Sequence, residues 1–217
     1  MPAISKMIQF VNGPASASLL KLAKSNAPGL IHGIALTNGK VMTDPDGVGS
    51  VARQDNDGSN AAVIFWDDEA AMKAFTKTAE FTDVVSQARH FSVAQPATDI
   101  VQKTTGKDYK AARAVLCIQG ILAGECTSSK EFWTSLSADQ HQESGEFMGS
   151  IPGVIIKHFL QGDIMSGDAM EDRLCGGCYL FESSDDIDAY ISGDIWKAGK
   201  DMAWDEISVE KYDIVLE

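Results

Sequence analysis

The sequence predicts an α+β fold in which tandem ferredoxin-like repeats form an intramolecular pseudo-dimeric α+β barrel. The segment IFWDDEAAMKAF at residues 64–75 reappears in related form as YLFESSDDIDAY at residues 179–190. A Pro-Gly pair likewise occurs at residues 28–29 and again at residues 152–153. In both halves the apolar pattern follows the order strand, helix, strand, strand, helix, strand, which is that of the ferredoxin-like unit. Because helices cover only one face of such a sheet, we expect the two sheets to cover each other.

The first repeat is predicted at residues 1–102. Pro14 favours a helix directly after the first strand, because proline fits the first helical turn. Asp67 to Glu69 place negative charge at the start of the second helix, where the helix dipole favours it. The long segment between the second and third strands contains DPDG and DNDG, and we interpret both as turns. The expected strands lie at residues 5–12, 30–41, 60–66 and 91–94.

The second repeat is predicted at residues 112–217, after a polar linker at residues 103–111 that has no periodicity. Ser128 to Glu131 have the pattern of a capping box at the start of a helix. Ser184 is expected to cap the second helix of this repeat. The expected strands lie at residues 112–122, 154–160, 177–181 and 209–216.

Composition restricts the possible partners and compartments. The 217 residues carry a net charge of −13. Residues 1–104 hold 9 basic and 10 acidic groups, whereas residues 105–217 hold 9 and 21. This acidity argues against nucleic acid and against anionic membranes as partners. Four cysteines are too few for a disulfide scaffold, and we find neither a secretory signal nor an apolar run long enough to span a bilayer. We therefore expect a cytoplasmic protein.

Gly176 to Phe181 (GGCYLF) are followed eight positions later by Ala189-Tyr190. This pattern resembles the G-G-x-Y-L-F…A-Y signature of the YdhR-like mono-oxygenase family. FVNGP at residues 10–14 and the Pro-Gly pair at residues 28–29 are similar to further elements of the family. The family belongs to the dimeric α+β barrel superfamily, with the antibiotic biosynthesis monooxygenases. The resemblance therefore implies the same barrel fold that the repeat predicts.

The resemblance also implies a small-molecule enzyme. Its substrate would be hydrophobic, aromatic or polyketide-like, and it would be oxygenated or cyclised without a cofactor. The alternative is a non-catalytic ligand-binding or stress-response module with the same fold. Trp66 followed by Glu69-Ala70 resembles the strand and helix start of the antibiotic biosynthesis monooxygenases. Their helix histidine is missing, because Phe75 and Tyr190 occupy the matching places in the two repeats.

Five residues are candidates for the site. Trp66, Tyr179 and Phe181 share one face under the repeat alignment and could line a substrate pocket, although such aromatics also fill ordinary cores. His32 and His158 occupy equivalent faces of the second strand in each repeat. Either could act as a general base or a haem ligand, or could be structural or exposed.

Common cofactor and metal motifs are missing from the sequence. It contains no G-x-G-x-x-G, phosphate loop, G-x-S-x-G or H-E-x-x-H. We therefore expect no cofactor and no metal site. A small hydrophobic molecule is the expected partner, and further oligomerisation of the pseudo-dimer is left open.

Overall fold

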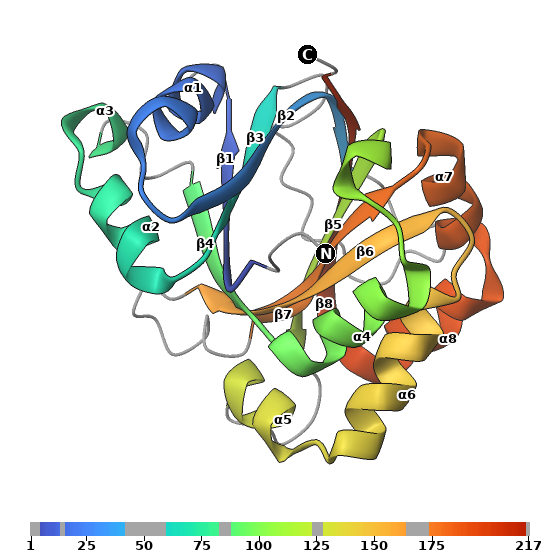
Figure 1. Ribbon diagram of the computed structural model, residues 1–217. Coiled ribbons are helices and arrows are strands. Elements are labelled where there is room, and N and C mark those ends of the chain that lie inside the picture. Colours follow the sequence, from blue (N-terminus) through green and yellow to red (C-terminus); the bar gives the residue numbers. More distant parts are fainter. Residues whose placement is uncertain are drawn as a thin grey trace.

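The computed structural model describes residues 5–13, 16–41, 60–82, 88–122, 128–163 and 174–215. The described strands form a closed barrel in the order β1-β3-β2-β8-β5-β7-β6-β4. Figure 1 shows α1, α2 and α3 outside one half of the barrel and α4 to α8 outside the other. The predicted fold class, an α+β pseudo-dimeric barrel, is confirmed.

The first half of the chain supplies one half of the barrel. The acidic segment does begin a helix, as predicted, and Asp68 caps α2 by accepting a hydrogen bond from the backbone of Ala71. The elements are β1 (Met7–Asn12), α1 (Ser16–Asn26), β2 (Leu30–Val41), β3 (Ala61–Trp66), α2 (Glu69–Thr76), α3 (Ala79–Thr82) and β4 (Ala88–Val93). The predicted turns DPDG and DNDG lie outside the described residues.

The second half repeats this order after a connecting helix. Ser128 caps the first helix of the repeat, while Ser183 rather than the predicted Ser184 caps the later one. The elements are α4 (Gln95–Thr105), a 3-10 helix (η3, Tyr109–Ala111), β5 (Ala114–Leu122), α5 (Ser129–Ser135), α6 (Ala138–Gly149), β6 (Val154–Asp163), β7 (Leu174–Phe181), α7 (Ser184–Ser192), α8 (Asp194–Ala203) and β8 (Trp204–Ile214). No helix of the described part is long and apolar enough to cross a bilayer.

The last strand of each repeat closes the barrel by pairing with the other repeat. β4 pairs with β6, with Val93 opposite Leu160. β8 pairs with β2 in the same manner, with Leu36 opposite Ile214. Neither repeat is left with an open sheet edge at these strands, and an open edge would invite intermolecular pairing.

The repeated sequence builds a repeated turn. Gly29 and Gly153 have φ angles of +79° and +76°. Their carbonyls accept hydrogen bonds from the backbone N–H of Asp67 and Glu182, both at 2.9 Å. This left-handed conformation favours glycine, which explains why the Pro-Gly pair occurs in both halves.

The structure differs from the predicted linker at residues 103–111. α4 runs through residue 105, and its Ala97 and Val101 are buried. Its Thr105 side chain donates a hydrogen bond of 2.7 Å to the Ile155 carbonyl on β6. The helix thus packs on the second half of the barrel, and its few apolar residues form one buried face inside an otherwise polar segment.

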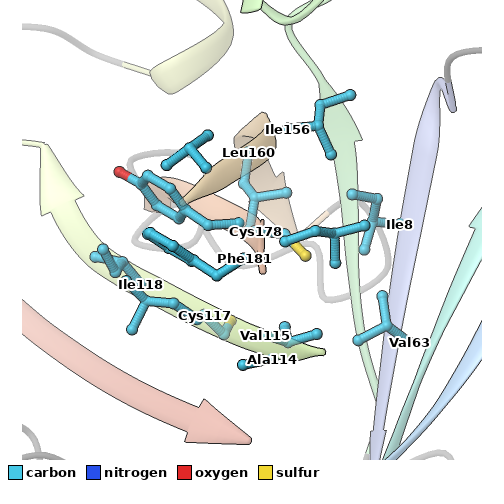
Figure 2. Packing of buried hydrophobic residues seen from close by; sticks show 14 of the residues in the cluster. Ile8, Val63, Ala114, Val115, Cys117, Ile118, Ile156, Leu160, Cys178 and Phe181 are labelled. Atoms are coloured by element: carbon cyan, nitrogen blue, oxygen red, sulfur yellow. The ribbon is translucent and has the colours of Figure 1, made fainter. Parts of the chain in front are cut away.

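The apolar core has two layers because alternate strand residues point to opposite faces. In β3, Phe65 and Val63 belong to the larger cluster, which fills the barrel and continues beneath α7 of the second repeat, while Trp66 and Ile64 belong to the cluster beneath the helices of the first repeat. Figure 2 shows Ile8 and Val63 from the first repeat turned towards Cys178 of the second. The barrel interior is thus built from both repeats.

Replacing Gly153 with alanine is expected to destabilise the protein by about 2–4 kcal/mol, from backbone strain and steric overlap together. A Cβ at this position would lie 2.3 Å from Cγ of Asp186. Gly106→Ala is the matched control, because Gly106 also has a positive φ of 61° but no heavy atom within 4 Å of such a Cβ. The control should cost only about 1–2 kcal/mol. Urea unfolding measures both changes, and equal losses would contradict the close-packed turn.

Candidate functional site

Four aromatic rings gather at the barrel interior from both repeats. His158 and Phe65 are buried, while His32 and Tyr109 are partly exposed. The ring centroids of Phe65 and His158 are 5.2 Å apart, and those of Tyr109 and His158 are 6.0 Å apart. His32 lies 6.2 Å from Phe65 and 6.3 Å from Tyr109 by the same measure. We call these four side chains the ring cluster.

Strand pairing explains why the two predicted histidines converge. His32 on β2 lies directly opposite Phe65 on β3, after a bulge between Leu30 and His32. His158 on β6 lies opposite Cys178, after an equivalent bulge at the start of that strand. Residues opposite each other in an antiparallel pair share a face, and here that face is the barrel interior. The structure therefore brings together two histidines that lie 126 positions apart.

A phenol already binds the buried imidazole within the ring cluster. Tyr109 Oη lies 3.2 Å from His158 Nε2. Burial lowers the pKa of His158 to about 4, partly opposed by the Cys178 backbone. Burial also raises the pKa of Tyr109. At neutral pH, the site therefore holds an uncharged imidazole beside a protonated phenol.

The direction of this hydrogen bond depends on the imidazole tautomer. His158 Nδ1 makes no hydrogen bond of ordinary geometry with the described residues. Even so, the nearby backbone of Cys178 opposes the lowering of the His158 pKa. In the tautomer with the proton on Nδ1, Nε2 accepts the hydrogen bond that the Tyr109 hydroxyl donates.

A second polar group inside the barrel is an ion pair between the closing strands. Arg89 on β4 donates to both carboxylate oxygens of Glu210 on β8, at 3.1 and 3.0 Å. Arg89 also donates to Asn12 at 3.2 Å, and the Tyr212 hydroxyl donates to Glu210 at 2.7 Å. The charges are compensated where they lie, so we interpret this network as structural.

The predicted pocket aromatics do not face the ring cluster. Trp66 packs against Phe75 of α2, with 5.2 Å between ring centroids. Tyr179 and Phe181 pack against Tyr190 of α7, at 5.7 and 6.0 Å. The repeat alignment correctly equated Trp66 with Phe181, but their shared face is the helix side of each sheet. The prediction that these three aromatics line one pocket with the histidines is therefore corrected.

Two members of the ring cluster, Phe65 and Tyr109, were not predicted from the sequence. Phe65 is next to Trp66 on a strand that is apolar on both faces, so periodicity does not show which face is the barrel interior. Tyr109 lies in the segment that looked like a linker. Phe65 shares a face with His32 through the pairing register of β2 and β3, which the sequence pattern alone does not give.

Two surface clefts of the described chain lie away from the ring cluster. One, of about 520 Å³, is lined by Asn38, Gly39, Lys40, Ser184, Lys211, Tyr212 and Asp213. The other, of about 320 Å³, is lined by Ile151, Pro152, Asp186, Ala189, Tyr190, Gly193, Asp194 and Ile195. Solvent meets the ring cluster at its partly exposed members, His32 and Tyr109. Among the residues described, no three His, Cys, Asp or Glu side chains group as metal ligands.

No family model matches the chain, and no curated protein matches it. Solved structures do match over its full length. An uncharacterized ferredoxin-fold protein from Listeria monocytogenes, related to antibiotic biosynthesis monooxygenases, superimposes with a TM-score of 0.54 at 9% identity, covering 100% of this chain and 98% of that one. A provisionally named monooxygenase from Fusobacterium nucleatum gives 0.52 at 11% identity, covering 100% and 94%.

The chain has the fold of the antibiotic biosynthesis monooxygenase-related proteins. An anthrone oxidase-like protein shares this fold with a TM-score of 0.50 at 10% identity, covering 97% of this chain and 90% of that one. These likenesses confirm the family resemblance of the sequence motifs at the level of fold. Because sequence identity is so low, the reaction has to be argued from the side chains of this chain.

The stability of the protein is expected to fall as the pH is lowered from about 6.5 to 4. Histidine in the unfolded chain titrates near pH 6.5, whereas burial lowers the pKa of His158 to about 4. Between these values only the unfolded chain takes up the proton, which favours unfolding by a total of about 3 kcal/mol.

His158→Gln should remove this part of the pH dependence, because glutamine does not titrate. Tyr109→Phe is the matched control and should keep it, because the imidazole stays buried. Urea unfolding at several pH values measures the difference between each variant and the unmodified protein. A pH dependence that is the same in the His158→Gln variant would contradict a buried neutral imidazole.

Proposed function

We propose that the chain is a monooxygenase-like enzyme that oxidises a hydroxylated aromatic substrate with molecular oxygen and without a cofactor. The observation that carries this proposal is the hydrogen bond of 3.2 Å between the Tyr109 phenol and His158 Nε2. It lies in an aromatic interior formed with Phe65 and His32. A substrate phenol has the same shape and polarity as the tyrosine side chain, so it can take this position when the 3-10 helix at residues 109–111 moves aside.

We propose that the two histidines have different roles in the reaction. His158 stays neutral because burial lowers its pKa to about 4, so it is a poor proton carrier but a good hydrogen-bond acceptor for a phenol. His32 is partly exposed and belongs to the same ring cluster. Solvent can hydrate its protonated form, which suits it to take the substrate proton and release it. His158 would orient the substrate, and His32 would be the general base.

The proposed reaction balances with oxygen alone, taking as the type of substrate an anthrone, whose enol tautomer carries the phenol hydroxyl. Loss of a ring CH₂ proton to His32 leaves a delocalised anion. The anion gives one electron to O₂, and the resulting radicals combine to form a C–O bond as a peroxide. Loss of water then yields the quinone, so one anthrone and one O₂ give one anthraquinone and one H₂O. The aromatic lining disfavours localised charge and favours the planar anion.

Proteins of the same fold support this class of reaction. One solved structure is that of an anthrone oxidase-like protein, and another is of a protein related to antibiotic biosynthesis monooxygenases. The alternative is a non-catalytic ligand-binding or stress-response module. It is favoured by the complete burial of His158 and by the position of the two described clefts away from the ring cluster.

Oxygen uptake with anthrone distinguishes these functions. We expect the protein to consume one O₂ for each anthraquinone formed. His158→Gln and His32→Gln should each lower the turnover rate by about 10²-fold, the usual contribution of a positioned acid–base group. His141→Gln should leave the rate unchanged, because His141 lies on α6 outside the barrel and stacks on Trp133.

Absence of oxygen uptake, with anthrone still bound, would support the binding module instead. An uptake rate that survives both substitutions in the ring cluster would place the reaction elsewhere in the molecule. Circular dichroism of each variant verifies that the fold is retained in the comparison.

A further inference from the structure

A buried lysine lies on the opposite face of β6 from His158. Lys157 is only 5% exposed. It pairs across the strands with Tyr179 of β7, on the side that the helices cover. The matching position of the first repeat is Gly33, where the side chain of Leu20 occupies the space that a Cβ would need. The lysine is therefore a feature of the second repeat alone.

Aromatic rings surround the Lys157 amine. Its Nζ lies 4.2 Å from the ring centroid of Phe159 and 4.8 Å from that of Tyr179. Trp133 of α5 packs on the same Phe159 ring, with 4.8 Å between centroids. A Cβ on Gly177 would lie 3.0 Å from Lys157 Cε and 2.5 Å from the Tyr179 ring, so this glycine makes room for both side chains. We call this arrangement the lysine cage.

The cage holds the amine without a neutralising carboxylate. Lys157 takes part in none of the ion pairs in the part of the chain that the structure describes. Burial lowers the pKa of Lys157 to about 7, partly opposed by Cys175. A large share of the amine is therefore neutral near pH 7.5, and the neutral amine is the form that attacks carbonyl carbon.

Two tyrosines connect the lysine cage with a surface cleft. Tyr190 lines the cleft of about 320 Å³ together with Ile151, Pro152 and Ile195. The hydroxyls of Tyr190 and Tyr179 are 3.4 Å apart, and their ring centroids are 5.7 Å apart. The Tyr179 ring in turn contacts the amine. A hydrophobic ligand in the cleft would thus contact Tyr190, which packs on Tyr179, and the Tyr179 ring contacts the Lys157 amine.

We propose that Lys157 is a reactive amine that binds hydrophobic carbonyl compounds covalently as an imine, with the cleft at Tyr190 as the entrance. The nitrogen forms a bond to the carbonyl carbon, and the carbonyl oxygen leaves as water with the two protons of the neutral amine. No oxidant or reductant is needed. This site is separate from the ring cluster, because successive residues of a strand point to opposite faces.

Pentane-2,4-dione tests the proposal, because an amine condenses with this diketone to an enaminone and water, and the enaminone absorbs in the near ultraviolet. The full chain is incubated with the diketone at pH 7.5, and the modified lysine is located by peptide mass spectrometry. We expect one enaminone per chain, on Lys157. It should form about 10²- to 10³-fold faster than on an ordinary lysine, of which about one in a thousand is neutral at this pH.

Matched variants separate this site from surface labelling. Lys157→Met should abolish the rapid absorbance change, whereas Lys73→Met should keep it, because Lys73 is a partly exposed residue paired with Glu69. Tyr190→Ala should raise the labelling rate several-fold by widening the entrance. Peptide mapping of the unsubstituted protein identifies the labelled lysine even if a variant does not fold.

Labelling spread over several lysines, or no labelling, would overturn the reactive amine. A labelling rate that Tyr190→Ala leaves unchanged would overturn the entrance through the cleft. Neither outcome depends on oxygen uptake at the ring cluster, so the two sites are tested independently.

Discussion

Closure of the barrel depends on two strands that each pair with both repeats. β4 pairs with β6, and β8 pairs with β2, so each sheet face is covered by the other repeat. The buried ion pair joins these same strands through Arg89 and Glu210. A buried pair of this kind adds little net stability, but removal of one partner costs about 3–5 kcal/mol because it leaves an uncompensated charge. We infer that the pair fixes how the two repeats meet in the barrel.

Adjacent residues of a strand point to opposite faces of the sheet, which explains why one strand contributes to two separate chemical environments. β6 places His158 inside the barrel and Lys157 under the helices, in adjacent positions. Both groups are buried and burial lowers both pKa values, yet their neighbours differ. His158 contacts a phenol that can donate a hydrogen bond to it, while Lys157 contacts only ring faces among the groups that define its cage. The same physical effect therefore produces a hydrogen-bond acceptor on one face and a nucleophile on the other.

The internal repeat was enough to predict the fold, because a duplicated strand and helix order restricts how the apolar faces can be covered. It also predicted that His32 and His158 occupy equivalent faces. It did not identify the interior face, since Phe65 and Trp66 are equally apolar neighbours and only the closed barrel distinguishes them. Tyr109 could not be predicted, because its role comes from a contact with His158 across 49 residues, in a segment without periodicity.

The most direct test of the phenol site is nitrogen NMR of the His158 side chain in the Tyr109→Ala variant, titrated with phenol and, separately, with benzene. Removal of the tyrosine ring leaves a space of matching shape beside Nε2. The proposed site predicts that the imidazole stays neutral at pH 5 to 7, and that phenol shifts the Nε2 resonance in a saturable way while benzene does not. Protonation of His158 near pH 6.5, or an Nε2 resonance that phenol leaves unchanged, would contradict it.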